Sequence, residues 1–251
     1  MAPNAQAQKL HDELFPGCKS TLAVTDPELV AVFGNFAFDE VLQFSMLEPR
    51  TRLMVQLAAI IASQAVQEYR VMLGAALTVG VSPVEVKEIV YQAVPYVGIA
   101  KVVDFLHATN EVLTGRGINL PLPGQATTTP ESRLEKGLAV QKQIIGDEFV
   151  ERLYSTAPKD QLHIQHFLSA NCFGDYLTRT GLDLRTRELL TFSMLVSLGG
   201  CEAQVKGHIG ANLRVGNDRP RLIDVLTQLL PFIGYPRTLN GLRAVDEVTG
   251  S

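Results

Sequence analysis

The chain has 251 residues, of which 46% are hydrophobic and 19% are charged, and it carries a formal net charge of -4 with a pI near 5.8. This balance is typical of a globular protein and excludes the polar, highly charged composition of disordered chains. An acidic chain also lacks the basic surface with which proteins bind phosphates, so neither DNA nor RNA is an expected partner.

The N-terminus and the cysteines indicate the compartment. The first residues, MAPNAQAQKLHDE, lack the apolar core of a signal peptide, and no stretch reaches the roughly 18 apolar residues that a membrane span needs. Cys18, Cys172 and Cys201 are odd in number and unequally spaced, which is no disulfide framework. We therefore expect a cytoplasmic protein with free thiols and no membrane partner.

An internal repeat covers most of each half of the chain. An offset of 136 residues aligns residues 72–113 with residues 208–249, with 12 identities in 42 positions. Within this alignment GAALTVG matches GANLRVG, and QAVPYVG matches QLLPFIG. Further upstream, the RTR of residues 50–52 meets that of residues 185–187 at an offset of 135, so one residue is gained or lost between the motifs.

In the first copy, apolar residues recur at helical intervals and strand-like alternation is scarce. Ser82 can cap a helix, and Pro95 lies where a continued helix would lose an amide donor. Residues 115–130, GRGINLPLPGQATTTP, are then dense in Gly, Pro and Thr and lack helical periodicity. That composition is typical of a connection between domains.

In the second copy, the apolar spacing of residues 189–196 is helical and ends at the pair Gly199-Gly200. Asn217-Asp218 can cap a later helix, and Pro231 repeats the place of Pro95. The same elements are therefore expected in both copies.

Together these elements predict an all-α fold of two tandem helical domains, each with about five or six helices. We place the first domain at residues 1–114, a linker at 115–130 and the second domain at 131–251. Packing of one copy on the other is the expected way to bury their apolar faces.

The segment CEAQVKGH contains the main candidates for chemistry. Cys201, Gln204 and His208 stand at i, i+3 and i+7, so they are expected to share one face of a helix. Cys201 follows two glycines and should begin that helix, where the helix dipole lowers the pKa of a thiol. The alternative is that Cys201 is a small buried hydrophobe and His208 a hydrogen-bonded core residue.

The segment RTRELLTFSMLVSLGGCEAQVKGHIGANLRVG, followed by PFIGYP, resembles the core signature of the carboxymuconolactone decarboxylase and alkylhydroperoxidase-D superfamily. The segment FGDYLTRTGLDLRTRE at residues 173–188 is similar to the one that leads into this signature in the decarboxylase branch. The resemblance implies alkylhydroperoxidase-D-like helical domains that assemble as trimers or hexamers. A chain with two copies would then form a homotrimer with six repeats.

The resemblance also separates two kinds of chemistry. The peroxidase branch has the signature Cys-x-x-Cys-x-x-x-His, in which a Glu and the His form a proton relay, and this implies a site role for Glu188. Glu188 is otherwise a residue of the charged first turn of an amphipathic helix. Here Gln204 occupies the second cysteine position, and glutamine cannot resolve a mixed disulfide or a sulfenic acid. Disulfide cycling is therefore disfavoured.

The first copy lacks these groups. Ala65, Glu68 and Met72 occupy the positions of Cys201, Gln204 and His208, so thiol chemistry is excluded there. Glu68 matches a motif position and stays a candidate site residue; the alternative is an exposed helix charge.

No metal or cofactor is expected. His163 and His166, with Cys172 beyond them, have neither the spacing nor the number of ligands of a zinc site. His11, His107 and Cys18 have no motif context and are interpreted as surface or packing residues.

The branch resemblance predicts a lyase that decarboxylates a carboxylated lactone or related small acid in aromatic-compound catabolism. The ring alkene and lactone carbonyl can hold the electrons, so no cofactor is needed, and His208, Cys201 and Gln204 would supply protons and hydrogen bonds. Glu68 or Glu188 would lie near the leaving carboxylate. A Cys201-dependent peroxidase and a non-catalytic oligomeric binding module are the alternatives.

Overall fold

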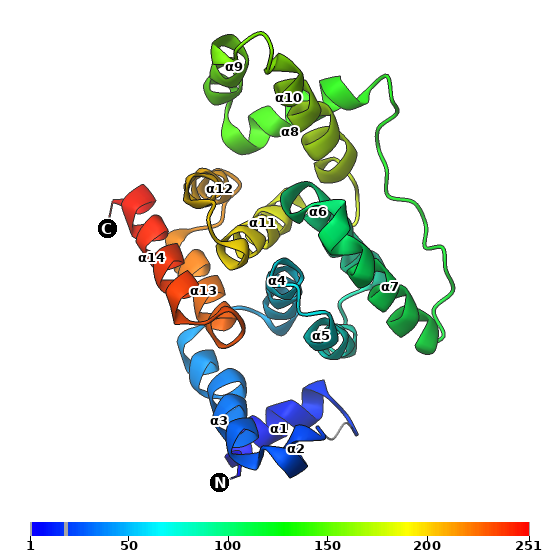
Figure 1. Cartoon of the computed structure of the whole chain (residues 1–251), viewed down its shortest axis with the longest axis vertical. Coiled ribbons are helices and arrows are strands. Elements are labelled where there is room, and N and C mark those ends of the chain that lie inside the picture. The colour runs from blue at the N-terminus through cyan, green and yellow to red at the C-terminus, as the bar shows by residue number, and fades with distance from the viewer. Residues whose placement is uncertain (1, 18–19, 251) are drawn as a thin grey trace.

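The computed structural model describes residues 2–17 and 20–250 of the chain (Figure 1). Over these residues it forms helices and no strand, which confirms the all-α prediction. The first half contains α1 (Ala5–Leu14), α2 (Leu22–Thr25), α3 (Pro27–Phe38), the 3-10 helix η1 (Glu40–Phe44), α4 (Pro49–Ala62), α5 (Val66–Thr78), α6 (Pro83–Val97) and α7 (Ile99–Gly115).

The second half contains α8 (Arg133–Ile145), α9 (Asp147–Thr156), α10 (Leu162–Phe167), the π-helix η2 (Leu168–Leu177), α11 (Leu184–Leu198), α12 (Glu202–Arg214), α13 (Arg219–Ile233) and α14 (Tyr235–Thr249). Among the described residues each half thus has seven α-helices, more than the five or six expected. Short helices precede the repeated core in both halves, and these are the elements that the periodicity does not resolve.

The repeated helices α4–α7 and α11–α14 form one intertwined core. Helix α4 packs against α11 at the centre of the molecule, while α6 packs on α11 and α13 packs on α4 (Figure 1). Two aligned glutamines also form hydrogen bonds between the copies. Gln92 Nε2 donates to Arg187 O at 2.8 Å, and Gln228 Nε2 donates to Val41 O at 2.9 Å. The expected packing of one copy on the other is confirmed.

The repeated helices begin and end where their caps require. Ser82 caps α6 in a reciprocal capping box with Glu85, and Asp218 accepts from Arg221 N at the start of α13. Pro95 and Pro231 lie inside the last turns of these helices. Each helix ends at the following glycine, Gly98 or Gly234, whose positive φ favours glycine.

The segment of residues 116–132 runs without helix along the outside of the molecule to a lobe of α8, α9, α10 and η2 (Figure 1). In this lobe α8 and η2 are in backbone contact, since a Cβ on Gly137 would lie 2.0 Å from Ser169 O. A second, smaller core includes Cys172 and Phe173 of η2 and Ala211 of α12. The lobe is thereby fixed against the repeated core.

Helices long and apolar enough to cross a membrane are lacking among the residues that the structure describes.

Candidate active site

Glu188 and His208 form a hydrogen-bonded pair between α11 and α12. His208 Nδ1 lies 2.8 Å from Glu188 Oε2. The Glu188 side chain is 0% exposed, whereas the His208 side chain is 17% exposed. A carboxylate accepts hydrogen bonds, so we assign the proton of this bond to Nδ1. The arrangement leaves Nε2 for a bound molecule and orients the ring.

Asn212 fixes the register of the two helices that carry this pair. Its Nδ2 donates to Glu188 O at 3.0 Å and to His208 O at 2.7 Å, and its Oδ1 accepts from Asn217 Nδ2 at 2.8 Å. Asn217 in turn donates to Arg185 O at 2.9 Å. A buried amide with all these bonds holds one relative position of α11 and α12, which is the position that brings the carboxylate to the imidazole.

Two further residues reach the pair from elsewhere in the chain. Tyr96, on α6 of the first copy, packs edge-on against His208 with 5.7 Å between ring centroids. Burial raises the pKa of Tyr96 well above that of an ordinary phenol, and the nearby Cys172 and Glu188 raise it further. Cys172 lies in the π-helix, a conformation that often marks functional sites. Burial raises the pKa of its thiol to about 12.

Two polar atoms in this cluster are buried without a hydrogen bond of ordinary geometry. They are Glu188 Oε1 and the Tyr96 hydroxyl oxygen. Buried polar atoms are nearly always paired in folded proteins, so such atoms have unused capacity for a polar ligand. The cluster thus brings together an imidazole, a carboxylate and a phenol, which are the groups that proton transfer and oxyanion binding use.

No chemical signal in the sequence indicates a site role for Tyr96 or Cys172. Tyr96 lies in the repeated QAVPYVG segment and aligns with Phe232. The alignment therefore indicates a packing aromatic ring at this position and no role for the hydroxyl. From the sequence, Cys172 is considered only as a metal ligand with His163 and His166, and that interpretation is rejected on spacing. Their approach to His208 depends on how α6 and η2 pack, and the local sequence does not encode that packing.

The low thiol pKa expected for Cys201 is wrong. Burial raises the pKa of this thiol, and the neighbouring Glu202 raises it further. Cys201 is the N-cap residue of α12, as its position after the two glycines predicts, but its side chain makes no cap hydrogen bond. Its Sγ instead donates to Leu195 O of α11 at 3.3 Å, so the thiol is directed to a carbonyl and not to the helix amides.

Among the described residues, neither Gln204 nor Glu68 forms a hydrogen bond with Glu188 or His208. Gln204 is exposed and makes no hydrogen bond with the residues that the structure describes. Glu68 is half-buried on α5, which packs on α4 and α7, and burial raises its pKa. Of the five candidate residues, the hydrogen bonds thus join only Glu188 and His208.

The remaining histidines of the second copy pack against aromatic rings. His166 lies edge-on to Tyr154, and His163 packs against Phe167. In the described part of the chain, no group of three or more His, Cys, Asp and Glu side chains is placed to hold a metal ion. Cys18 lies outside the described residues.

The profile of the Carboxymuconolactone decarboxylase family matches the chain twice, at residues 27–111 and 163–247. The chain belongs to the carboxymuconolactone decarboxylase family. The two matched regions contain α4–α6 with most of α7, and α11–α13 with most of α14, so the family unit is present in tandem, as the internal repeat predicts.

Known proteins of this family resemble one copy or both. A 4-carboxymuconolactone decarboxylase from Acinetobacter baylyi is 26% identical over 118 residues, which are 47% of this chain and 87% of that protein. A crystal structure from Burkholderia xenovorans LB400, of a protein assigned as a gamma-carboxymuconolactone decarboxylase subunit, covers 99% of both chains. Its TM-score is 0.54 and its sequence identity is 22%, so it shows a shared fold.

Proposed function

We propose that the protein is a carboxy-lyase that decarboxylates a carboxylated lactone, or a related small acid, in the breakdown of aromatic compounds without a cofactor. The observation that carries the proposal is the buried Glu188–His208 pair, which leaves the imidazole Nε2 for a substrate. The Acinetobacter baylyi relative supports the reaction class, since its name states the decarboxylation of 4-carboxymuconolactone.

The reaction moves one electron pair and one proton. The bond between the ring carbon and its carboxylate breaks, CO₂ leaves, and the electron pair delocalises through the ring alkene onto the lactone carbonyl oxygen. A proton then adds to a ring carbon, which restores the neutral lactone. The substrate itself stores the electrons, so the protein has to stabilise the developing oxyanion and deliver the proton.

Each residue of the cluster has one task in this reaction. His208 delivers the proton from Nε2, while Glu188 accepts from Nδ1–H and stabilises the positive imidazolium. The Tyr96 hydroxyl donates a hydrogen bond to the developing enolate oxygen, and its raised pKa keeps the phenol protonated as a donor. Cys172 contacts this cluster as a neutral thiol and takes no electrons.

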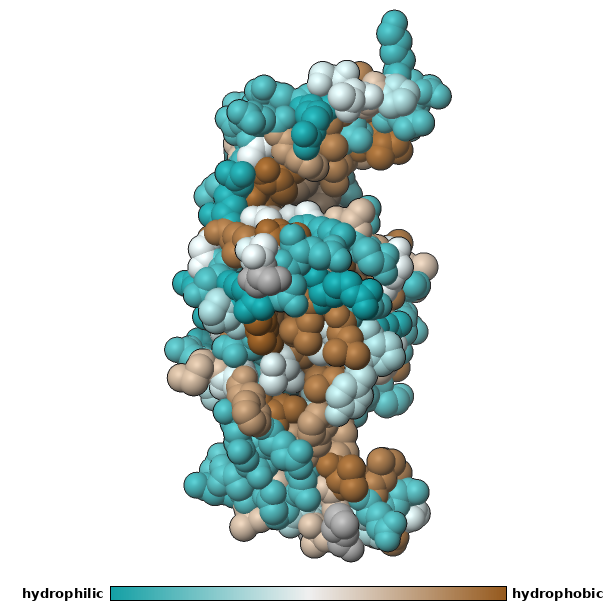
Figure 2. Space-filling model, turned by 90° about the vertical axis from the view of Figure 1, so that its left-hand side faces the viewer, coloured by the Kyte–Doolittle hydropathy of each residue, from teal (hydrophilic) through white to brown (hydrophobic). Residues whose placement is uncertain are grey.

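We also propose that the enzyme is cytoplasmic and assembles as a homotrimer through the two equivalent helices α7 and α14. Ile99 and Val103 of α7 align with Tyr235 and Leu239 of α14, and all four side chains are exposed. Figure 2, which faces the side where α14 lies, shows apolar side chains gathered in the middle of that face. Light scattering tests this assembly, and a monomer at micromolar concentration contradicts it.

A thiol peroxidase is the weaker candidate. Gln204 occupies the position of the resolving thiol, and the raised pKa of both Cys172 and Cys201 lowers the thiolate fraction that reacts with peroxide. A non-catalytic binding module is favoured only by the loss of reactive residues from the first copy. Turnover of peroxide with added dithiothreitol would identify the peroxidase.

The test is CO₂ release from 4-carboxymuconolactone by the purified protein, before and after treatment with a chelator. We expect metal-independent release that falls by about tenfold or more in Tyr96→Phe, because one hydrogen bond to a developing oxyanion is lost. Tyr91→Phe, on the same helix but outside the cluster, is the matched control and should keep the wild-type kcat. Equal kcat for both variants would exclude Tyr96 from the reaction.

A further inference from the structure

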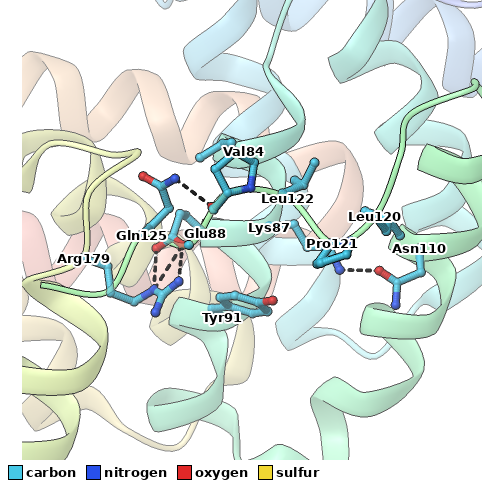
Figure 3. A pocket seen from close by; sticks show the side chains of 12 residues that line it. Val84, Lys87, Glu88, Tyr91, Asn110, Leu120, Pro121, Leu122, Gln125 and Arg179 are labelled. Atoms are coloured by element: carbon cyan, nitrogen blue, oxygen red, sulfur yellow. Dashed lines mark hydrogen bonds and ion pairs between the residues drawn. The ribbon is translucent and has the colours of Figure 1, made fainter. Parts of the chain in front are cut away.

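A cavity of about 370 Å³ lies away from the Glu188–His208 pair, between α6, α7 and the non-helical segment that follows α7 (Figure 3). This volume is within the range of small-molecule sites in proteins. The apolar side chains of Val84, Leu120 and Leu122 form part of its wall. The candidate active-site residues do not line it.

Two arginines converge on a single carboxylate beside this cavity. Arg179 donates to both oxygens of Glu88, with its Nη2 2.9 Å from Oε1 (Figure 3). Arg187 donates to Oε2 of the same carboxylate at 3.0 Å. Glu88 is the one acidic side chain among the described residues that line the cavity. Its single negative charge is therefore shared by two arginines, of which Arg187 is completely buried.

Lys87 adds a positive charge that forms no ion pair with a carboxylate of the described residues. Its Nζ is hydrogen-bonded to the side-chain oxygen of Asn110, which is a neutral amide (Figure 3). Burial lowers the pKa of Lys87, so the protein environment disfavours this charge in the absence of an anion. Counting Arg179 and Lys87 against Glu88, the wall carries an excess of one positive charge, and the buried Arg187 behind Glu88 adds a second.

Tyr91 gives the cavity a flat aromatic surface between its cations. The Arg179 guanidinium lies 5.1 Å from the centroid of the Tyr91 ring, and Lys87 Nζ lies 5.9 Å from the same centroid. Figure 3 shows this ring below the Arg179–Glu88 pair and facing the cavity. Both cations lie over the Tyr91 ring, so an aromatic group and positive charge adjoin one another, which suits a ligand that joins a ring to an acidic group.

We propose that this cavity is a second binding site, for a small ring-bearing carboxylate with one or two negative charges. The carboxylate lies between Lys87 and Arg179, where it balances the excess charge, and the ring packs on Tyr91 and the apolar wall. The site contains no group placed for bond breaking, so its ligand is bound and not converted.

Phthalate is a suitable probe, with benzamide as the neutral ring and inorganic phosphate as the anion without a ring. Isothermal titration calorimetry on the full-length protein at low salt should show phthalate binding tighter than either control. Asn110→Asp places a carboxylate beside Lys87 at nearly constant volume. We expect this variant, and Lys87→Gln, to weaken phthalate binding by about tenfold or more, since each removes a charge-assisted contact.

Matched controls decide where the probe binds. Lys101→Gln removes an exposed lysine of α7 outside the cavity and should leave phthalate affinity unchanged. Circular dichroism melting of each variant confirms that it is folded. The proposal is overturned if phthalate fails to bind, if phosphate or benzamide binds as tightly, or if His208→Ala weakens phthalate binding while Asn110→Asp and Lys87→Gln do not.

Discussion

The two copies of the family unit differ at the positions where the second copy pairs a carboxylate with an imidazole. Glu188 and His208 align with Leu53 and Met72, and both of these apolar residues are about 1% exposed in the main core. Asn212, which holds the register of the pair, aligns with the buried Ala76. The same two helices thus enclose a polar cluster in one copy and an apolar core in the other.

This difference indicates that the first copy supports the site of the second copy through packing. Its helix pair α4 and α5 contributes hydrophobic burial, which needs no hydrogen-bond partners. Its helix α6 packs on α11 of the second copy and brings Tyr96 to His208. A degenerate copy can therefore be required for the cluster although it retains none of the reactive residues of the signature.

The largest expected change is in kcat, and it distinguishes variants of the second copy from variants of the first. His208→Ala and Glu188→Gln should each lower kcat by about 10²–10⁴-fold, the usual contribution of a general acid and its partner. Met72→Ala should leave kcat unchanged and cost about 2–5 kcal/mol of unfolding free energy, because it opens a cavity in the core. Steady-state kinetics and urea unfolding measure the two effects; a wild-type kcat for His208→Ala contradicts the proposal.

The next effect compares two aligned acids on α6 and α13. Glu88 is buried with Arg187, whereas its counterpart Asp224 accepts only the Met46 amide near the surface. Glu88→Gln leaves buried arginine charge uncompensated and should cost about 3–5 kcal/mol of stability. Asp224→Asn should change stability by less than about 1 kcal/mol. Equal losses in urea unfolding would show that the two acids have the same role.

A smaller effect concerns the thiols. The reactive form is the thiolate, so a raised pKa for Cys201 should make alkylation at pH 7 slower than that of free glutathione. The rate should keep rising with pH beyond the ordinary thiol range. Cys172, with a pKa of about 12, should be alkylated only after unfolding. Peptide mapping after pulsed iodoacetamide measures each site, and fast labelling of Cys201 at pH 6 contradicts this ordering.

The smallest effect concerns Glu68. Burial raises its pKa in the folded state, so ionisation favours the unfolded state and wild-type stability falls as pH rises through this raised pKa. Glu68→Gln removes the ionisation and should raise Tm slightly at pH 7 but not at pH 4, with kcat unchanged. Thermal melts at both pH values, beside melts of the wild type, measure the difference. A large loss of kcat in this variant would place the reaction in the first copy.

The helical class, the repeat and several helix ends could be predicted from the sequence alone, because they depend on local periodicity and capping. Ser82 and Asp218 cap as predicted, and the order Arg-Glu, Cys, His marked the helices that carry Glu188 and His208. These features are written in residues that are near one another in the chain, so their spacing is enough to find them.

Which side chains meet follows from the tertiary structure. Cys201, Gln204 and His208 share a helical spacing, yet only His208 bonds a side chain of α11, that of Glu188, while the Cys201 thiol donates to a backbone carbonyl of the same helix. Tyr96 reaches the same cluster from α6 of the first copy, and Cys172 reaches it from η2, the helix before α11. Periodicity predicts which residues share one face of a helix. Packing between helices decides which residues that face contacts, and it also causes the burial that shifts pKa values.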